Sequence, residues 1–276
     1  MEFRLLYPNF KQKAFTFSYD DGVLQDEKLI EIFRRYGFKG TFNIPFGWAG
    51  KEKLRNGIDC SHFLMDEKTR ALYTGHEVAC HTYEHPHMEG LPLAEQRSQI
   101  EANVKALSSF FDATIRGGAY PFGTYDANTL QALKEAELSY YRTTRSTYAF
   151  NLPYNFLLWH PTIHHRDPRL YETLRRFYED KTELGVFYLW GHSYEFALDD
   201  NFDLLAEICR SLASQKDLIN LTNGEIYCYV NAATMVYYRD GAFINPSGID
   251  VYLQAGKAKQ PLLVKANSRL PYLEER

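Results

Sequence analysis

Short apolar stretches alternate with stretches of helical periodicity along most of the chain. Residues 14–19 (AFTFSY) alternate large apolar with small or polar side chains, which is typical of a β-strand. Residues 23–36 place Leu29, Ile30 and Phe33 at helical spacing, and a glycine follows. The same patterns predict strands at 41–44, 77–80, 113–116, 139–143, 156–164, 185–190 and 218–221, with helices at 66–73, 92–111, 126–138, 169–180 and 201–215.

About seven strand–helix repeats predict an α/β fold class with a parallel sheet. A distorted (β/α) barrel fits better than a doubly wound sheet, because no glycine-rich phosphate turn follows the first strand. The tail changes character, with short strands predicted at 235–238, 248–253 and 261–264. We therefore expect a barrel domain over residues 1–230 and a small C-terminal β extension over residues 231–276.

The composition narrows the function classes. The 276 residues are 45% hydrophobic, which is enough for a sizeable core, and the net charge of −4 with no basic run argues against a nucleic-acid partner. No apolar run of about 18 residues predicts a membrane span, and the first residues lack the pattern of a secretion signal. The four cysteines form no CxxC pair, so we expect reduced thiols and a cytoplasmic protein.

Three groups of polar residues directly follow predicted strands. In chain order they are Asp20-Asp21-Gly22, His81 with His85, and Gly191-His192. The carboxyl ends of parallel strands in a barrel lie on one face. We therefore expect these residues, which are distant in the sequence, to meet there.

A zinc-type cation accepts imidazole and carboxylate ligands, and a catalytic site often uses three of them and leaves one position open. His81, His85 and one of the two aspartates make such a set. The HExxH motif of zinc proteases does not fit, because this pair follows a strand, is directly followed by Pro86, and has its acid, Glu84, beside the second histidine. Taken singly, each group is more typical of a structural role: Asp20-Asp21-Gly22 of a turn that ends a strand, the two histidines of surface or loop capping, and His192 of a buried, hydrogen-bonded histidine. Their convergence at strand ends predicts the metal site.

A fourth group, residues 116–123 (RGGAYPFG), is rich in glycine and proline and indicates an unusual backbone path. One interpretation is a surface loop with an exposed arginine. The other is a loop that presents backbone N–H groups to an oxyanion, with Arg116 steering a carboxylate.

Taken together, the motifs SYDDG, HTYEHP, RGGAYPFG and LWGH, in this order, resemble those of the polysaccharide deacetylases, carbohydrate esterase family four. The resemblance covers about residues 13–225 and implies a distorted (β/α) barrel. It implies a metal-dependent hydrolase in which water activated by the metal attacks the amide carbonyl of an N-acetylated, or the ester of an O-acetylated, carbohydrate.

The resemblance also assigns roles. Asp20 corresponds to the catalytic base, His192 to the general acid, Arg116 to the arginine that pairs with the base, and the Phe122 N–H to the oxyanion donor. The implied metal ligands are Asp21, His81 and His85, and Thr82 corresponds to the small hydroxyl residue of the histidine motif. Zinc is the expected metal, with cobalt, nickel or manganese as alternatives.

Two departures from the family pattern concern the substrate. Trp190 stands where leucine usually lines the acetyl pocket, and residues 140–144 (YYRTT) do not show the usual Asp/Trp motif. The candidate substrate-binding residues are Tyr120, Pro121, Trp159, His164, Trp190, Tyr194 and Glu195.

Two other functions stay open from the sequence. The same metal site would also suit another C–N bond, such as a cyclic imide, a formamide or a small amide. A non-catalytic carbohydrate-binding protein is the second alternative. The expected partners are a carbohydrate or small amide substrate, and a homo-oligomer is compatible with the sequence.

Overall fold

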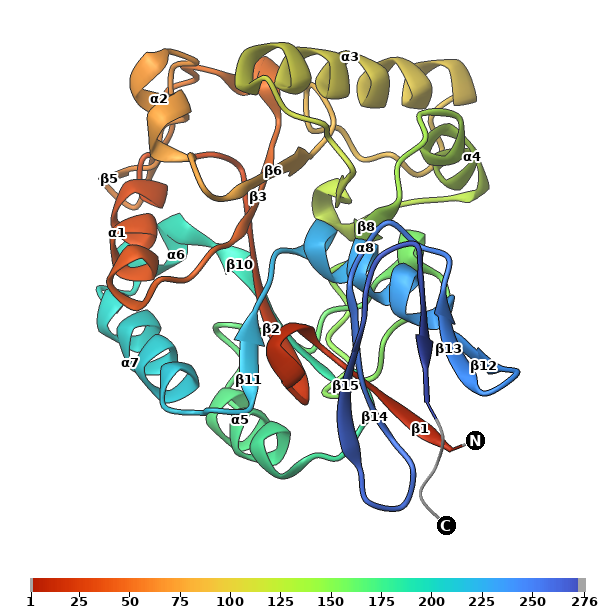
Figure 1. The fold of residues 1–276 in the computed structure, drawn as a ribbon. Helices are drawn as coiled ribbons and strands as arrows, with labels where there is room; N and C mark the ends of the chain where they lie inside the picture. Colours follow the sequence, from red (N-terminus) through yellow and green to blue (C-terminus); the bar gives the residue numbers. More distant parts are fainter. Residues whose placement is uncertain (1, 273–276) are drawn as a thin grey trace.

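The computed structural model describes residues 2–272, and eight parallel strands form its central sheet. The sheet order is β8-β7-β6-β3-β2-β10-β9, and β11 also pairs with β2. The strands are β2 (Lys13–Asp20), β3 (Thr41–Ile44), β6 (Glu77–Cys80), β7 (Gly117–Ala119), β8 (Tyr140–Arg142), β9 (Ile163–His164), β10 (Val186–His192) and β11 (Leu218–Asn220). This curved sheet is the distorted (β/α) barrel expected from the sequence (Figure 1).

Helices cover the outside of the sheet (Figure 1). They are α1 (Asp26–Tyr36), α2 (Glu67–Leu72), α3 (Leu93–Phe111), α4 (Ala127–Glu135), α5 (Leu170–Glu179), α6 (Ser193–Leu198), α7 (Phe202–Ala213) and α8 (Asn223–Thr234). Short 3₁₀ turns lie at Pro8–Phe10, Phe46–Trp48, Pro121–Gly123 and Phe156–Leu158. Among the described residues no helix is both long and apolar enough to cross a membrane.

The central strand β2 is buried along its whole length. Phe15, Phe17 and Tyr19 join the main apolar core between sheet and helices. The alternate residues are polar from Thr16 onward: Ser18 accepts a hydrogen bond from an asparagine of β3, and Asp20 ends the strand. Both faces of β2 are thus buried: one packs in the apolar core, and the other faces the polar barrel interior.

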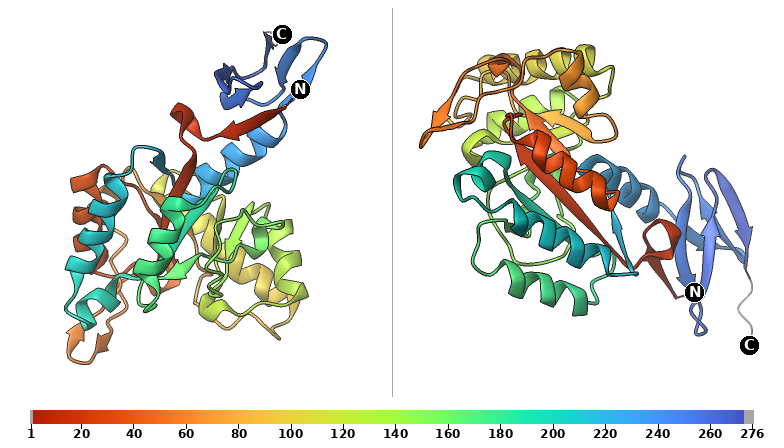
Figure 2. Two further views of the ribbon diagram at one scale, coloured as in Figure 1. Left: turned by 90° about the horizontal axis from the view of Figure 1, so that it is seen from below. Right: turned by 90° about the vertical axis from the view of Figure 1, so that its left-hand side faces the viewer.

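The remaining strands lie outside the barrel. They are β1 (Phe3–Leu6), β4 (Leu54–Arg55), β5 (Ile58–Asp59), β12 (Tyr237–Arg239), β13 (Ala242–Asn245), β14 (Val251–Ala255), β15 (Gln260–Val264) and β16 (Ser268–Pro271). Strands β12, β13 and β16 form one sheet, and β1, β14 and β15 another. Figure 2 shows these C-terminal strands set to one side of the barrel, beside the N-terminus.

Two features bear on the expected division at residue 230. Helix α8 runs across that position, and its residues pack in the same apolar cluster as β14. Strand β1 pairs antiparallel with β14, so the first residues of the chain complete a sheet of the C-terminal extension. A cut at residue 230 would divide a helix and leave β1 without its partner.

Candidate active site

Strand register brings the first aspartate and the last histidine together. Asp20 and His192 are the final residues of β2 and β10, and the parallel pairing places them opposite each other. The Nε2 atom of His192 lies 4.0 Å from Oδ2 of Asp20. His81 follows β6 directly, two strands away on the other side of β2. The residues therefore meet at the carboxyl ends of the strands, where barrel sites are built.

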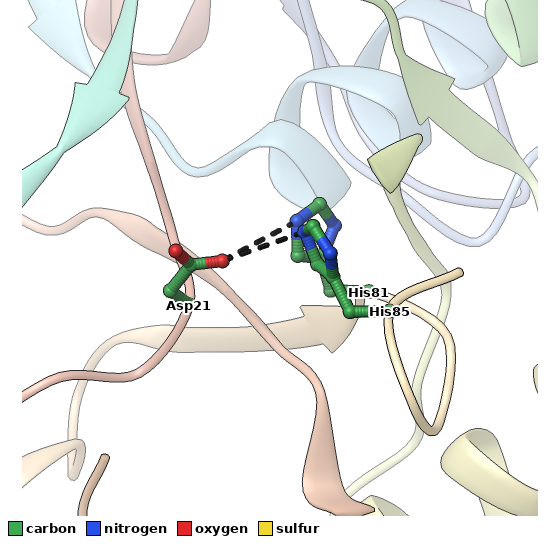
Figure 3. A group of neighbouring side chains, drawn as sticks. All are labelled: Asp21, His81 and His85. Atoms are coloured by element: carbon green, nitrogen blue, oxygen red, sulfur yellow. Dashed lines mark ion pairs between the residues drawn. The ribbon is translucent and has the colours of Figure 1, made fainter. Parts of the chain in front are cut away.

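Three side chains converge beside Asp20. The Oδ1 atom of Asp21 lies 3.8 Å from Nε2 of His81 and 3.6 Å from Nε2 of His85 (Figure 3). One potential ligand atom from each residue lies within 4.8 Å of the other two. The Nδ1–H of His81 donates to the Ala119 carbonyl at 2.8 Å, which leaves the Nε2 lone pair facing the carboxylate.

Left-handed backbone conformations at the metal-ligand candidates set the direction of their side chains. Asp21 has φ +81°, Thr82 +58° and His85 +55°. Such values are uncommon for residues with a side chain and persist where the surroundings hold them. The Asp21 N–H donates to the Asn43 carbonyl at 3.0 Å, which anchors the turn after β2.

The donor set fits a divalent cation of the zinc type. The Asp21 Oδ1 atom is buried and has no hydrogen-bond partner in the described chain. Burial lowers the pKa of His81 and lowers that of His85 to about 3, so both imidazoles are neutral at pH 7 and keep a lone pair. A bound cation would satisfy the buried carboxylate oxygen, and two histidines and one carboxylate are the ligands expected.

Asp20 lies in a different environment from Asp21. Its Oδ1 accepts a hydrogen bond from Asn43 Nδ2 at 2.8 Å, and its Oδ2 forms a salt bridge with the Arg142 guanidinium. Burial would raise the pKa of Asp20, but Arg142 and the nearby histidines hold it below its ordinary value. Asp20 is therefore ionised and already paired, while Asp21 has a free oxygen.

The expectation that Arg116 pairs with the base is wrong. The strand expected at 113–116 begins only at Gly117, so Arg116 precedes it and is exposed at the opposite end of the sheet from the site. Arg142, the last residue of β8, takes that place and is fully buried. Its guanidinium also lies over the Trp190 ring, 4.2 Å from the centroid.

His192 is held by the carboxylate of Glu195. Oε2 of Glu195 accepts from the His192 backbone N–H at 2.9 Å and lies 3.2 Å from His192 Nδ1. The same oxygen lies 3.2 Å from His164 Nε2. Burial alone would lower the pKa of His192, but the hydrogen bond to Glu195 and the two site aspartates raise it above its ordinary value. His192 is thus oriented with Nε2 toward Asp20.

The segment after β7 borders the metal-ligand set. Phe122 has φ +56° and is 55% exposed, and its ring centroid lies 4.5 Å from that of His85. Its N–H donates to no other residue of the described chain, so it is available to a ligand. Tyr120 is buried and donates its hydroxyl hydrogen to the Leu157 carbonyl at 2.7 Å, so only its ring faces the cavity.

Comparison with known proteins gives the family. Residues 8–141 match the model for polysaccharide deacetylases. These residues belong to the polysaccharide deacetylase family. YxkH of Bacillus subtilis, named as a candidate polysaccharide deacetylase, is 23% identical over 126 residues, which are 45% of this chain and 42% of that protein. The chain thus spans less than half the length of this curated relative.

Two solved structures share the fold of the deacetylase domain. One is a candidate polysaccharide deacetylase from Mycobacterium smegmatis, with a TM-score of 0.61 and 15% identity over 86% of this chain and 97% of that one. The other is a family 4 carbohydrate esterase from Streptomyces lividans in complex with acetate, with a TM-score of 0.53 and 16% identity over 76% and 92% of the two chains. At such identities the likeness concerns the fold.

A cavity of about 380 Å³ opens above the site of the deacetylase domain. Its lining residues are Asp20, Asp21, Trp48, Lys53, Arg55, His81, His85, Tyr120, Phe122, Thr144, Trp190, His192 and Tyr194. Of the expected substrate-binding residues, Tyr120, Trp190 and Tyr194 are on its wall.

The other four expected substrate-binding residues do not line this cavity. Trp159 is 2% exposed and packs against core aromatic rings, and Pro121 is buried. His164 and Glu195 lie behind His192, where they support it.

Sequence reasoning missed several residues of the candidate active site. Arg142 and Asn43 hold Asp20 from within strands, and Trp48, Lys53 and Arg55 come from the segment between β3 and α2. A signal for Arg142 was present, because an arginine that follows two tyrosines in a predicted strand is almost never buried without a charged partner.

Proposed function

We propose that the chain is a metal-dependent hydrolase that removes N-acetyl or O-acetyl groups from a carbohydrate. One observation carries the proposal: an ionised carboxylate, Asp20, and an oriented imidazole, His192, lie 4.0 Å apart beside a buried triad of metal-ligating side chains. A base and an acid next to a cation site are the groups that hydrolysis of an amide requires.

Asp21, His81 and His85 would hold the metal. A divalent cation bound there supplies Lewis acidity, which polarises a carbonyl and makes water a better nucleophile at neutral pH. Zinc is the metal that this donor set fits best.

Asp20 acts as the general base in this proposal. It accepts the proton of the attacking water as the new C–O bond forms, and Arg142 and Asn43 keep its carboxylate ionised and fixed for that transfer.

His192 acts as the general acid. Its raised pKa favours the protonated imidazole, and Glu195 orients the ring so that Nε2 delivers a proton to the departing amine. The Phe122 N–H, which has no acceptor in the described chain, donates to the oxyanion; one such donor is typically worth about 3 kcal/mol in the transition state.

The two neighbouring aspartates test the proposal. Asp21→Asn is expected to lower both the metal content of the purified protein and its rate of acetate release. Asp20→Asn is expected to keep the metal and to lower the rate at least ~100-fold, because it removes only the base. Metal content is measured by elemental analysis, and acetate release is measured on N-acetylglucosamine oligomers with and without chelator.

Equal loss of metal in the two variants would contradict the division of roles. Cyclic imides, formamides and small amides are tested in parallel. Turnover of these without acetate release would identify the alternative C–N hydrolase. Tight sugar binding without turnover by the metal-loaded protein would identify a carbohydrate-binding protein.

A further inference from the structure

A small hairpin brings two cationic side chains to the wall of the cavity. Strands β4 and β5 are joined by Asn56 and Gly57, which have φ +50° and +79° and so form a tight two-residue turn. Lys53 and Arg55 are two residues apart and share one face of the hairpin, which lines the cavity. Leu54 between them is 74% exposed on the other face.

Each cation contacts an aromatic ring that in turn contacts a histidine of the candidate site. The Lys53 Nζ lies 5.1 Å from the centroid of the Trp48 ring, which is itself 4.5 Å from the ring of the metal-ligand candidate His85. The Arg55 guanidinium lies 4.1 Å from the Tyr194 ring, which is 5.0 Å from the ring of His192. One positive charge therefore borders the metal side of the cavity, and the other borders the acid side.

No carboxylate of the described chain forms an ion pair with Lys53 or Arg55, and the buried Arg55 Nε has no hydrogen-bond partner there. Lys51, which does not line the cavity, lies 4.2 Å from the same Trp48 ring. The carboxylates that do face the cavity, Asp20 and Asp21, are accounted for by Arg142 and the metal-ligand set. Lys53 and Arg55 are thus without an ion-pair partner among the described residues.

We propose that the substrate carries an anionic group, a carboxylate or a phosphate, which Lys53 and Arg55 bind beside the acyl group. This proposal rests on the proposed hydrolase function and names the substrate class of that site. A neutral sugar would find stacking partners in Trp48 and Tyr194 but would leave both cations unpaired. An arginine presents a planar fork and a lysine a point charge, and both suit carboxylate and phosphate oxygens.

Three probes of similar size test the proposal: N-acetylglucosamine, which is neutral, N-acetylmuramic acid, which carries a carboxylate, and N-acetylglucosamine 6-phosphate. We expect at least one anionic probe to bind the metal-loaded protein roughly tenfold or more tighter than the neutral sugar, as charge-assisted hydrogen bonds allow. Raising the salt concentration should weaken that binding and leave the neutral sugar unaffected. Binding is measured by calorimetry and acetate release by an enzymatic assay.

The variant Lys53→Gln/Arg55→Gln should abolish the preference for the anionic probe and leave binding of the neutral sugar within about twofold. Arg116→Gln is the matched control, because it removes a positive charge at the opposite end of the sheet. Circular dichroism checks that each variant is folded, and the single variants Lys53→Gln and Arg55→Gln replace the double variant if the hairpin is disturbed.

Equal affinity for neutral and anionic probes, or the same loss in the double variant and the control, would overturn the anionic substrate. This outcome differs from failure of the proposed function, in which no probe releases acetate. If no probe releases acetate, calorimetry still shows whether the anionic probes bind more tightly, because binding does not depend on turnover.

Discussion

The guanidinium of Arg142 lies between the Asp20 carboxylate and the ring of Trp190, and it is fully buried. The side chain therefore does two things at once: it keeps the base ionised, and it fixes the tryptophan that forms one wall of the cavity. A lysine could supply the charge but not a flat group that stacks on an indole.

Arg142→Gln is expected to lower activity more than ~100-fold and to move the acid limb of the kcat/KM profile to higher pH. Arg142 holds the pKa of Asp20 low, so its loss lets the base take up a proton at a higher pH. The pH profile is the measurement, with metal content determined in parallel. Arg142→Lys should move the acid limb less than Arg142→Gln does, since lysine retains the positive charge.

Arg116→Gln is the control for Arg142→Gln. Because Arg116 is exposed, this variant should have the same rate and the same pH profile as the natural chain. A loss of activity in Arg116→Gln equal to that in Arg142→Gln would contradict the assignment of Arg142 to Asp20.

The residues that the sequence located correctly are those at strand ends. Asp20, Asp21 and His192 follow strands with clear patterns, so their position on one face of the barrel could be predicted. Arg116 was misplaced because Gly117 and Gly118 were taken for a loop. They are in β7, where a Cβ on Gly118 would lie 2.0 Å from the Cys80 carbonyl oxygen, so the glycines serve close strand packing.

At the scale of elements, helix α8 closes the end of the barrel opposite the active site. Glu77, at the start of β6, accepts hydrogen bonds from the Gly224 N–H at 2.9 Å, the Thr41 hydroxyl at 2.8 Å and the Tyr140 hydroxyl at 2.9 Å. One carboxylate thus joins the N-terminus of α8 to three strands. Gly224 permits this approach, because a Cβ there would lie 2.3 Å from Glu77 Oε1.

Glu77→Ala is expected to lower the free energy of unfolding by about 2–3 kcal/mol, because three donors would lose a charged acceptor. Denaturant unfolding monitored by circular dichroism measures the change. Glu101→Ala, on the exposed face of α3, is the control and should have little effect. Equal stability of the two variants would show that the Glu77 contacts contribute little.

The existence of α8 was not predicted from its apolar pattern, which does not follow one stripe, because both the barrel and the C-terminal sheets cover the helix. A local signal was nevertheless present. Thr222 and Glu225 form a capping box, and their spacing in the sequence is the one expected at a helix N-terminus. The hairpin β4–β5 was missed although Asn56-Gly57 is a typical turn pair.

At the scale of the whole molecule, stability should depend on pH through His76, which packs against the rings of Phe33 and Phe42. Burial, together with Arg34 and Lys39, lowers the pKa of His76 from 6.5 to about 4. Between these values the unfolded chain binds a proton that the folded chain does not. The contribution of His76 to stability is therefore complete above pH 6.5 and is lost as the pH falls toward 4.

His76→Gln is expected to reduce the fall in unfolding free energy between pH 6.5 and pH 4 by up to about 3 kcal/mol relative to the natural chain. The measurement is a series of denaturant titrations across this range. His87→Gln, which replaces an exposed histidine, serves as the control. The same slope in the natural chain and in His76→Gln would refute the role of His76.

The pairing of β1 with β14 has a consequence for how the protein is made. On the ribosome, β1 emerges first, and its partner emerges only after every strand of the barrel has been synthesised. Contacts between segments so distant in the chain form late, because closing the intervening loop costs entropy before any contact repays it. We therefore expect the barrel to assemble before β1 finds its partner, and the outer sheet to form late in folding.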